Sequence, residues 1–137
     1  MIAERPVIAV LDDEPEMRKA LRRLLAGRGF QVEEYECGDD FLAVLGSHPL
    51  HCVLLDLHMP GLNGFEVLEA MIARGIPVPV IVITAHEEAG RAERAFALGA
   101  SAYLTKPVDR DDLFSAIAEA SAGTPKVGPG SKGCATK

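Results

Sequence analysis

Hydrophobic and polar residues follow two different periods along this chain. Three apolar runs, at residues 6–11, 52–55 and 79–84, contain almost no polar side chain and end abruptly at a turn or a charged residue. Short uninterrupted runs of this kind are typical of strands that are buried on both faces. Residues 102–105 and the imperfectly alternating residues 30–35 predict two further short strands, the latter at an edge of the sheet.

Between these runs the apolar residues recur at helical spacing. From Met17 the positions i, i+3, i+4, i+7 and i+8 are all apolar, which predicts a helix from about Pro15 to Gly27. Its opposite face is basic and is expected to be a solvated surface. Four more helices are predicted: a short one capped by Asp39 or Asp40, one after Asn63 that ends near Gly75, one at 87–98 with a weak apolar face, and one capped by Asp109.

Strand and helix therefore alternate five times along the chain. Alternation with nearly all-apolar strands predicts an α/β fold, in which right-handed crossovers place helices on both faces of a parallel sheet. The 137 residues suit a single domain, which we assign to residues 1–122. Residues 123–137 have almost nothing to bury and are expected to be a disordered tail or the stub of a linker.

Composition excludes several classes of protein. A formal net charge of −6 gives no general attraction to nucleic acid or to an anionic membrane, and no apolar run is long enough to span a bilayer. The cysteines (Cys37, Cys52 and Cys134) are odd in number and form no C-x-x-C pair. This pattern indicates a reduced, cytoplasmic protein and not a disulfide scaffold or a structural zinc site.

The residues at which the strands stop share a chemistry. In open α/β sheets ligands bind at the carboxyl ends of the strands. Those ends carry three carboxylates, one hydroxyl and one ammonium group: Asp12 and Asp13, Asp56, Thr84, and Lys106. Crowded carboxylates repel one another unless a cation joins them, and Mg²⁺ accepts a few carboxylate oxygens while it keeps waters for a phosphate. Lys106, Thr84 and the backbone N–H beside the small Ala85 could bind phosphoryl oxygens, so the set suits phosphoryl transfer to a nucleophilic Asp56.

Each of these residues also has a simpler structural interpretation. Asp12 and Asp13 could cap the first helix, Thr84 could be an ordinary β-branched strand residue, and Lys106 could be a surface lysine before a proline. Glu14 is read as an ordinary first-turn acid that is favoured by the helix dipole. The functional interpretation is preferred because all the groups end strands on one edge.

The motifs carried by these residues resemble the receiver domains of bacterial response regulators. The resemblance covers about residues 6–122 and rests on the following segments: Leu11-Asp12-Asp13-Glu14, residues 56–64, Val82-Ile83-Thr84-Ala85, Tyr103, and Lys106-Pro107. It implies a flavodoxin-like sheet of strand order 2-1-3-4-5. It also implies that Asp56 takes a phosphoryl group from the phosphohistidine of a sensor histidine kinase or phosphotransfer protein.

The same resemblance assigns roles to single residues. Asp13, Asp56 and the backbone carbonyl of His58 would hold Mg²⁺, with Asp12 nearby through a water molecule. Thr84 and Lys106 would bind the phosphoryl oxygens, and a cis peptide bond before Pro107 would hold the lysine.

Signal output is a further implication of the resemblance. Tyr103 would turn inward as Thr84 moves toward the phosphate, although half-buried packing is its simpler interpretation. The partner-facing surface would then comprise the helix from about Glu87, the strand at Tyr103 and the helix after Asp109. That face could also carry a phosphorylation-dependent homodimer. His58 and His86 are either solvated loop residues or side chains that tune the lifetime of the phosphoryl group.

Two rival functions are weighed against this one. A small-molecule phosphatase that works through an aspartyl-phosphate needs a second acid two residues after its nucleophile, and this chain has His58 there. A pure interaction module that never takes phosphate would have a broken acidic pocket, whereas every expected residue is present. We therefore expect a switch and not an enzyme with an external substrate; the cognate kinase and the output pathway are not encoded in these motifs.

Overall fold

The computed structural model describes residues 5–85 and 89–121. Five strands alternate with five helices in these ranges: β1 Val7–Leu11, α1 Pro15–Gly27, β2 Gln31–Tyr35, α2 Gly38–Val44, β3 Cys52–Leu55, α3 Gly64–Arg74, β4 Val80–Thr84, α4 Arg91–Ala97, β5 Ala102–Thr105, and α5 Arg110–Ser121. All neighbouring strands are parallel, and their order is β2-β1-β3-β4-β5. The predicted fold class, strand order and edge position of β2 are confirmed.

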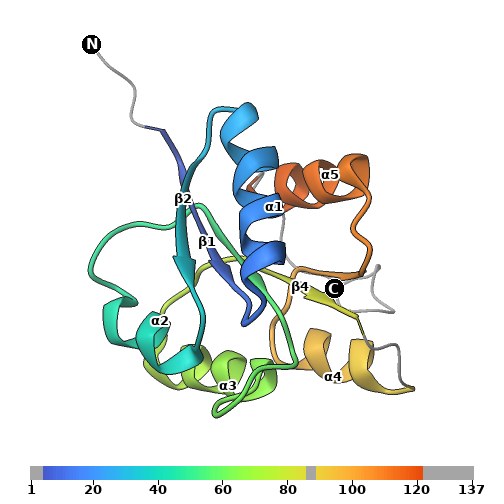
Figure 1. Ribbon diagram of the computed structural model, residues 1–137. Helices are drawn as coiled ribbons and strands as arrows, with labels where there is room; N and C mark the ends of the chain where they lie inside the picture. Colours follow the sequence, from blue (N-terminus) through green and yellow to red (C-terminus); the bar gives the residue numbers. More distant parts are fainter. Residues whose placement is uncertain (1–4, 86–88, 122–137) are drawn as a thin grey trace.

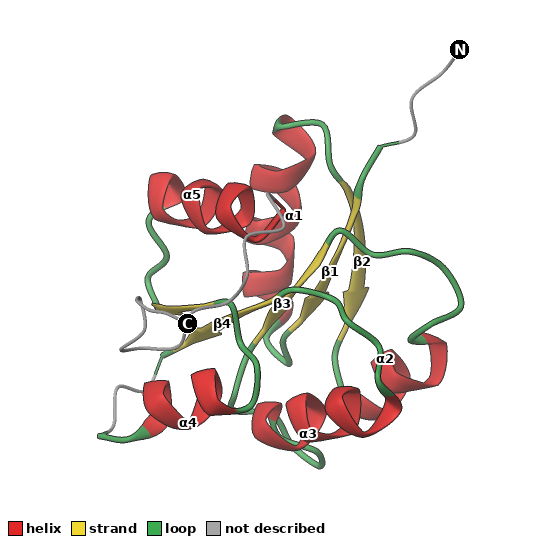
Figure 2. Cartoon of the chain, turned by 180° about the vertical axis from the view of Figure 1, so that it is seen from behind, coloured by secondary structure: helices red, strands yellow, loops and turns green. Residues whose placement is uncertain are grey.

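The helices cover both faces of the sheet, with α1 and α5 on one side and α2, α3 and α4 on the other (Figures 1 and 2). Alternate residues of each strand point to opposite faces, so the central strands β1, β3 and β4 contribute side chains to two separate hydrophobic cores. Ile8, Leu54 and Ile81 pack with α1 and α5, whereas Leu55 and Val82 pack with the α2–α4 layer. Burial on both faces explains why these strands read as continuous apolar runs.

Several helices begin at residues whose capping or turn preferences are recognisable in the sequence. Pro15 occupies the first turn of α1, and Asn63 and Glu66 form a reciprocal capping box at the start of α3. The side chain of Asp109 accepts a hydrogen bond from the backbone N–H of Asp112 at 3.0 Å, as expected for the cap of α5. The peptide bond between Lys106 and Pro107 is cis.

Two predicted helix starts are wrong. Helix α2 begins at Gly38, one residue before Asp39, and its N-cap residue Cys37 makes no side-chain cap hydrogen bond. Helix α4 begins at Arg91, four residues later than the expected Glu87, because Gly90 at its N-cap adopts a left-handed conformation with φ of 87°. Both helices have seven residues, so their weak periodicity left the boundaries poorly defined.

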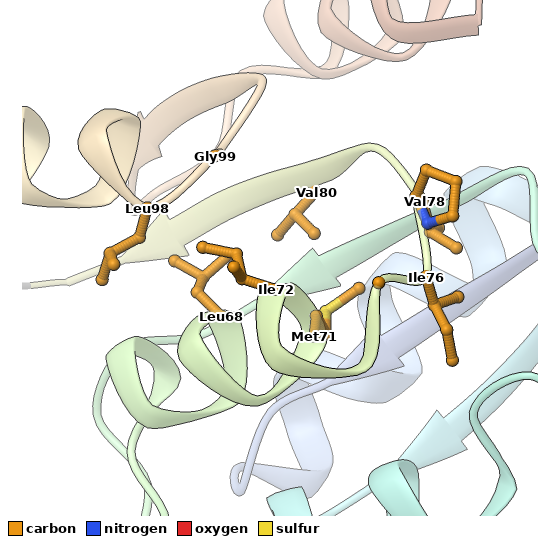
Figure 3. A pocket seen from close by; sticks show the side chains of 10 residues that line it. Leu68, Met71, Ile72, Ile76, Val78, Val80, Leu98 and Gly99 are labelled. Carbon is orange, nitrogen blue, oxygen red and sulfur yellow. The ribbon is translucent and has the colours of Figure 1, made fainter.

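An apolar groove of about 310 Å³ lies at the amino ends of β4 and β5. Its walls are the last turns of α3, the 76–78 connection and Leu98 after α4, and the side chains of Leu68, Ile72 and Leu98 face it in Figure 3. No helix within the described residues combines the length and the apolar character that crossing a bilayer requires. The proposed tail at 123–137 lies outside the described residues.

Candidate functional site

Parallel register brings the ends of β1 and β3 side by side. Leu11 pairs with Leu55, and the backbone N–H of Asp56 donates to the carbonyl of Leu11 at 2.9 Å. The next residues of both strands, Asp12 and Asp56, therefore leave the sheet together. Ligand oxygens of Asp12, Asp13 and Asp56 all lie within 4.8 Å of one another.

Residues of β4 and β5 reach the same edge. Thr84 pairs with Thr105, and the backbone N–H of Lys106 donates to the Thr84 carbonyl at 2.8 Å. The Lys106 ammonium lies 3.0 Å from Asp12 Oδ2 and 3.7 Å from Asp56 Oδ2. The sheet thus brings together the carboxylates of β1 and β3, the ammonium group that follows β5 and the threonine that ends β4.

Polar burial is concentrated at this point of the molecule. Across the described part of the chain, the buried polar or charged residues are Asp12, Asp56 and Thr84, which are 2%, 4% and 0% exposed. Asp13 and Ala85 are more exposed. Burial of ionisable groups away from water is costly unless they are paired, so this concentration makes the cluster a candidate functional site.

The carboxyl group of Asp56 is strongly perturbed. Its burial raises the pKa most, and the neighbouring Asp12 carboxylate raises it further. The backbone N–H of His58, which donates to Asp56 Oδ1 at 3.2 Å, and the Lys106 ammonium both oppose this rise. The net pKa of Asp56 is about 6, which leaves the carboxylate mostly ionised at neutral pH.

Lys106 is held by three acids. Burial lowers its pKa, but the hydrogen bonds to Glu14 and Asp12 and the charges of Asp12 and Asp56 outweigh burial and raise the pKa above its ordinary value. Lys106 Nζ donates to Glu14 Oε1 at 3.0 Å, across 92 residues of sequence. The interpretation of Glu14 as an ordinary first-turn acid therefore missed its ion pair with the site lysine.

Asp12 has two further contacts. Its Oδ1 accepts a hydrogen bond from the backbone N–H of Glu14 at 2.9 Å. Glu14 is itself the N-cap residue of α1 and has no side-chain cap hydrogen bond, so this contact precedes the helix and Asp12 does not cap it. The Asp12 carbonyl accepts from the guanidinium of Arg18 at 2.8 Å, and Arg18 also pairs with Glu34 of β2 at 3.5 Å. Arg18 is thus not part of a purely solvated basic face, because it fixes the backbone beside the acidic cluster.

The structure describes two of the remaining predicted residues, Tyr103 and His58. Tyr103 pairs with Val82 in register and packs against the α2–α4 core, and its hydroxyl oxygen is buried. The exposed His58 follows Asp56 by two residues, and its ring accepts a hydrogen bond from Arg91 of α4 at 2.9 Å. His86 lies outside the described residues. Sequence patterns did not indicate the Arg91 contact.

The cluster fits a hard divalent cation. Three carboxylates within 4.8 Å, two of them buried, supply the oxygen donors that Mg²⁺ prefers, and no soft nitrogen or sulfur donor belongs to the group. Cys37 and Cys52 are free thiols that take no part in it.

Comparison with known proteins agrees with the fold. The response regulator receiver domain family matches residues 8–118. The chain is 38% identical to the transcriptional regulatory protein FixJ of Bradyrhizobium diazoefficiens over 113 residues, which are 82% of this chain and 55% of that protein. It is 36% identical to the DNA-binding transcriptional regulator NtrC of Salmonella typhimurium over 117 residues, 85% of this chain and 25% of NtrC. The chain therefore spans about a quarter to a half of the length of these relatives.

Solved structures show the same architecture. The crystal structure of FixJ-N superimposes with a TM-score of 0.81 at 31% identity and covers 88% of this chain and 96% of that one. The chemotaxis protein CheY4 of Vibrio cholerae shares the fold with a TM-score of 0.79 at 22% identity, over 85% of this chain and 99% of that one. On these matches and on the strand-end residues, this chain belongs to the response regulator receiver domain family.

Proposed function

We propose that this chain is the phosphoacceptor switch of a two-component signalling system. In this proposal Asp56 accepts a phosphoryl group from the phosphohistidine of a sensor histidine kinase or phosphotransfer protein. The observation that carries the proposal is the convergence of three carboxylates within 4.8 Å on a lysine ammonium 3.7 Å from Asp56. An ionised acid, a cation site and a compact ammonium group are what acyl-phosphate formation requires.

The proposed metal ligands are Asp13, Asp56 and the backbone carbonyl of His58, with Asp12 close by through water. When bound, Mg²⁺ would supply positive charge to the phosphoryl oxygens, which lowers the repulsion between phosphate and carboxylate. The raised pKa of Asp56 arises largely from burial and from Asp12, so a cation at this position would also favour the ionised, nucleophilic form.

The transfer step can be written with its bonds balanced. A carboxylate oxygen of Asp56 forms the new P–O bond, and the P–N bond of the donor phosphohistidine breaks as the imidazole nitrogen takes back the electron pair. Lys106 moves from its acidic partners toward the phosphoryl oxygens, with Thr84 and the Ala85 N–H as additional donors. A later attack by water on phosphorus returns the Asp56 carboxylate and releases inorganic phosphate, so no external substrate is turned over.

Phosphorylation would then change the partner-facing surface. A shift from mostly off to mostly on needs about 5.5 kcal/mol of preference for the on-state. Charge-assisted contacts from Thr84 and Lys106, at about 1.5–3 kcal/mol each, supply a preference of that order. We place the responsive surface on α4, β5 and α5, with Tyr103 as its inward-turning aromatic. That surface could carry either a downstream partner or a phosphorylation-dependent dimer.

His58 and His86 are proposed to tune how long the phosphoryl group survives, by obstructing or orienting the attacking water. The hydrolysis rates of phosphorylated His58→Ala and His86→Ala should each differ from wild type by more than about twofold, or roughly 0.4 kcal/mol of barrier. Smaller changes would show that neither histidine side chain controls the lifetime of the phosphoryl group.

Several related proteins are named as DNA-binding or transcriptional regulators, and this chain matches only their receiver portion. We propose that any nucleic-acid binding belongs to an output partner or domain beyond these residues, and that the chain acts in the cytoplasm.

Acetyl phosphate with Mg²⁺ tests the proposal, because it supplies the phosphoryl group without a partner protein. Intact-mass measurement should show one phosphoryl adduct on wild type and none on Asp56→Asn, and EDTA should abolish the adduct. Asp39→Asn, which removes an exposed aspartate from α2, is the matched control and should be modified normally. An adduct that persists in Asp56→Asn, or its absence from wild type under these conditions, would overturn the proposal.

A further inference from the structure

The amino end of α4 contacts the loop that follows β3. Arg91, the first residue of α4, places Nη1 2.9 Å from Nε2 of His58, although the two residues are 33 positions apart in sequence. A guanidinium group has donors and no acceptor, so Arg91 donates and the His58 ring nitrogen accepts. This contact joins α4 directly to the segment that begins at Asp56.

In the loop after β3, the backbone of His58 contacts the side chain of Asp56, because the His58 N–H donates to Asp56 Oδ1 at 3.2 Å. Its neighbours Leu57 and Met59 are buried, at 2% and 8% exposure, whereas the His58 side chain is exposed. The flanking residues are thus held by the core, and Arg91 holds the residue between them.

We infer that Arg91 is a positioning residue. Through the His58 side chain it fixes the backbone at residue 58, whose N–H orients Asp56 and whose carbonyl is a proposed metal ligand; the inference therefore rests on the proposed function. Contacts that orient metal ligands contribute measurably to affinity even though they never touch the metal. Because coupling is reciprocal, binding at the acidic cluster also stabilises the present position of the α4 amino end.

The direction of the change in Mg²⁺ affinity distinguishes a positioning role of Arg91 from a purely electrostatic one. Arg91 is a cation near a proposed cation site, so removal of its charge would by itself tighten Mg²⁺ binding. Loss of a positioning contact weakens Mg²⁺ binding instead. A substitution of Arg91 therefore has opposite consequences under the two explanations.

Arg94 provides a matched control on the same helix. Its guanidinium lies 4.1 Å from the centroid of the Phe65 ring of α3 and is one turn away from Arg91. Arg94→Gln removes the same charge from the same element and leaves the contact to His58 in place. Both arginines are surface residues of a short helix, so neither variant removes buried core.

The experiment uses the full chain with Mg²⁺ alone as the probe. The variants are Arg91→Gln, His58→Ala, their double mutant and Arg94→Gln. Calorimetric titration gives the Mg²⁺ dissociation constant, and amide hydrogen exchange of residues 57–59 gives loop positioning without metal. We expect Arg91→Gln to raise the dissociation constant about fivefold and to speed exchange, and Arg94→Gln to stay within about twofold of wild type.

The double mutant supplies the test that a general structural role would not pass. If Arg91 acts through the His58 ring, Arg91→Gln adds nothing in the His58→Ala background. Unchanged or tighter Mg²⁺ binding by Arg91→Gln, or an effect of equal size without the His58 ring, overturns the inference. Absence of Mg²⁺ binding by wild type overturns the proposed function instead, and the exchange data then still decide whether Arg91 positions the loop.

Discussion

The two edges of the sheet differ in the chemistry of the side chains that gather at them. At the carboxyl edge, Asp12 and Asp56 are buried beside the Lys106 ammonium. At the amino edge, the groove of about 310 Å³ beside α3 is lined entirely by apolar side chains and glycines (Figure 3). One parallel topology produces both edges. The difference teaches that the residues which end the strands set the chemistry of each edge. Under the proposed function, this chemistry decides which edge binds a cation and a phosphate.

Helix α3 connects these two edges and has a glycine at each end. Gly64 is the first residue of α3, and its N–H donates to the carbonyl of Leu57, the residue after Asp56, at 3.1 Å. Gly75 ends the helix beside the apolar groove, in a left-handed conformation with φ of 67°. The two glycines allow the same substitution to probe each edge.

The largest effect is expected at the carboxyl edge. A Cβ added at Gly64 would lie 2.7 Å from both the Asp56 carbonyl oxygen and the Leu57 Cα, so backbone must move. Gly64→Ala should lower the free energy of unfolding by about 3 kcal/mol, measured by urea denaturation, and should weaken Mg²⁺ binding. A loss below about 1 kcal/mol would show that the loop behind Asp56 yields easily and would remove the contrast between the edges.

The second effect is a gain in the free energy of unfolding when Asp56 is replaced by Asn. Burial and the Asp12 carboxylate raise the pKa of Asp56 to about 6, so in metal-free protein the folded state holds this proton more tightly than the unfolded state. The free energy of unfolding should therefore fall as pH rises from about 4 to about 6, and the penalty is complete above that range. Asn has no carboxyl group to ionise, so Asp56→Asn avoids the cost of a buried charge at this position. Its free energy of unfolding at pH 7.5 in EDTA should exceed that of wild type by about 2 kcal/mol.

Urea denaturation across this pH range in EDTA measures both quantities. Wild type and Asp56→Asn should have similar stability near pH 4 and diverge as the pH rises. If wild type and Asp56→Asn are equally stable at pH 7.5, or if their curves stay parallel throughout, ionisation of the buried Asp56 carboxyl group does not destabilise the folded state. Asp39→Asn, an exposed change of the same chemistry, should follow the wild-type curve.

A smaller effect is expected at the other end of α3. Gly75 has a positive φ but no atom within 4 Å of an added Cβ, so Gly75→Ala meets conformational strain and no steric clash. We expect a loss of about 1 kcal/mol in the free energy of unfolding. Modification of Asp56 by acetyl phosphate should be unchanged. Impaired modification would show that the two edges are coupled through the helix.

Residues at strand ends could be predicted from the sequence because parallel strands have one carboxyl edge. If residues 6–11, 52–55 and 79–84 are parallel strands, Asp12, Asp56 and Thr84 must lie on that edge, and the structure places them there. The order of the strands came from the family resemblance and not from periodicity. Whether the site residues act as proposed depends on the experiments above.

Contacts between side chains of distant segments could not be predicted in this way. The Glu14–Lys106 pair spans 92 residues and the Arg91–His58 pair spans 33, and both depend on the reach of flexible side chains that no periodicity encodes. The late start of α4 depends on the left-handed Gly90, in a segment whose apolar face was already weak. The groove depends on where α3 lies relative to Leu98, which only the packed layers determine.

The smallest effect concerns the rim of that groove. Ile72 is 56% exposed, while its neighbour Met71 is 4% exposed and belongs to the core. Ile72→Ala should change the free energy of unfolding by less than about 0.5 kcal/mol, whereas Met71→Ala, measured alongside it by urea denaturation, should cost about 2 kcal/mol or more. If Ile72→Ala costs as much as Met71→Ala, the rim is packed in solution. The amino edge would then be an extension of the core, and the contrast between the edges would rest on the acidic cluster at the carboxyl edge alone.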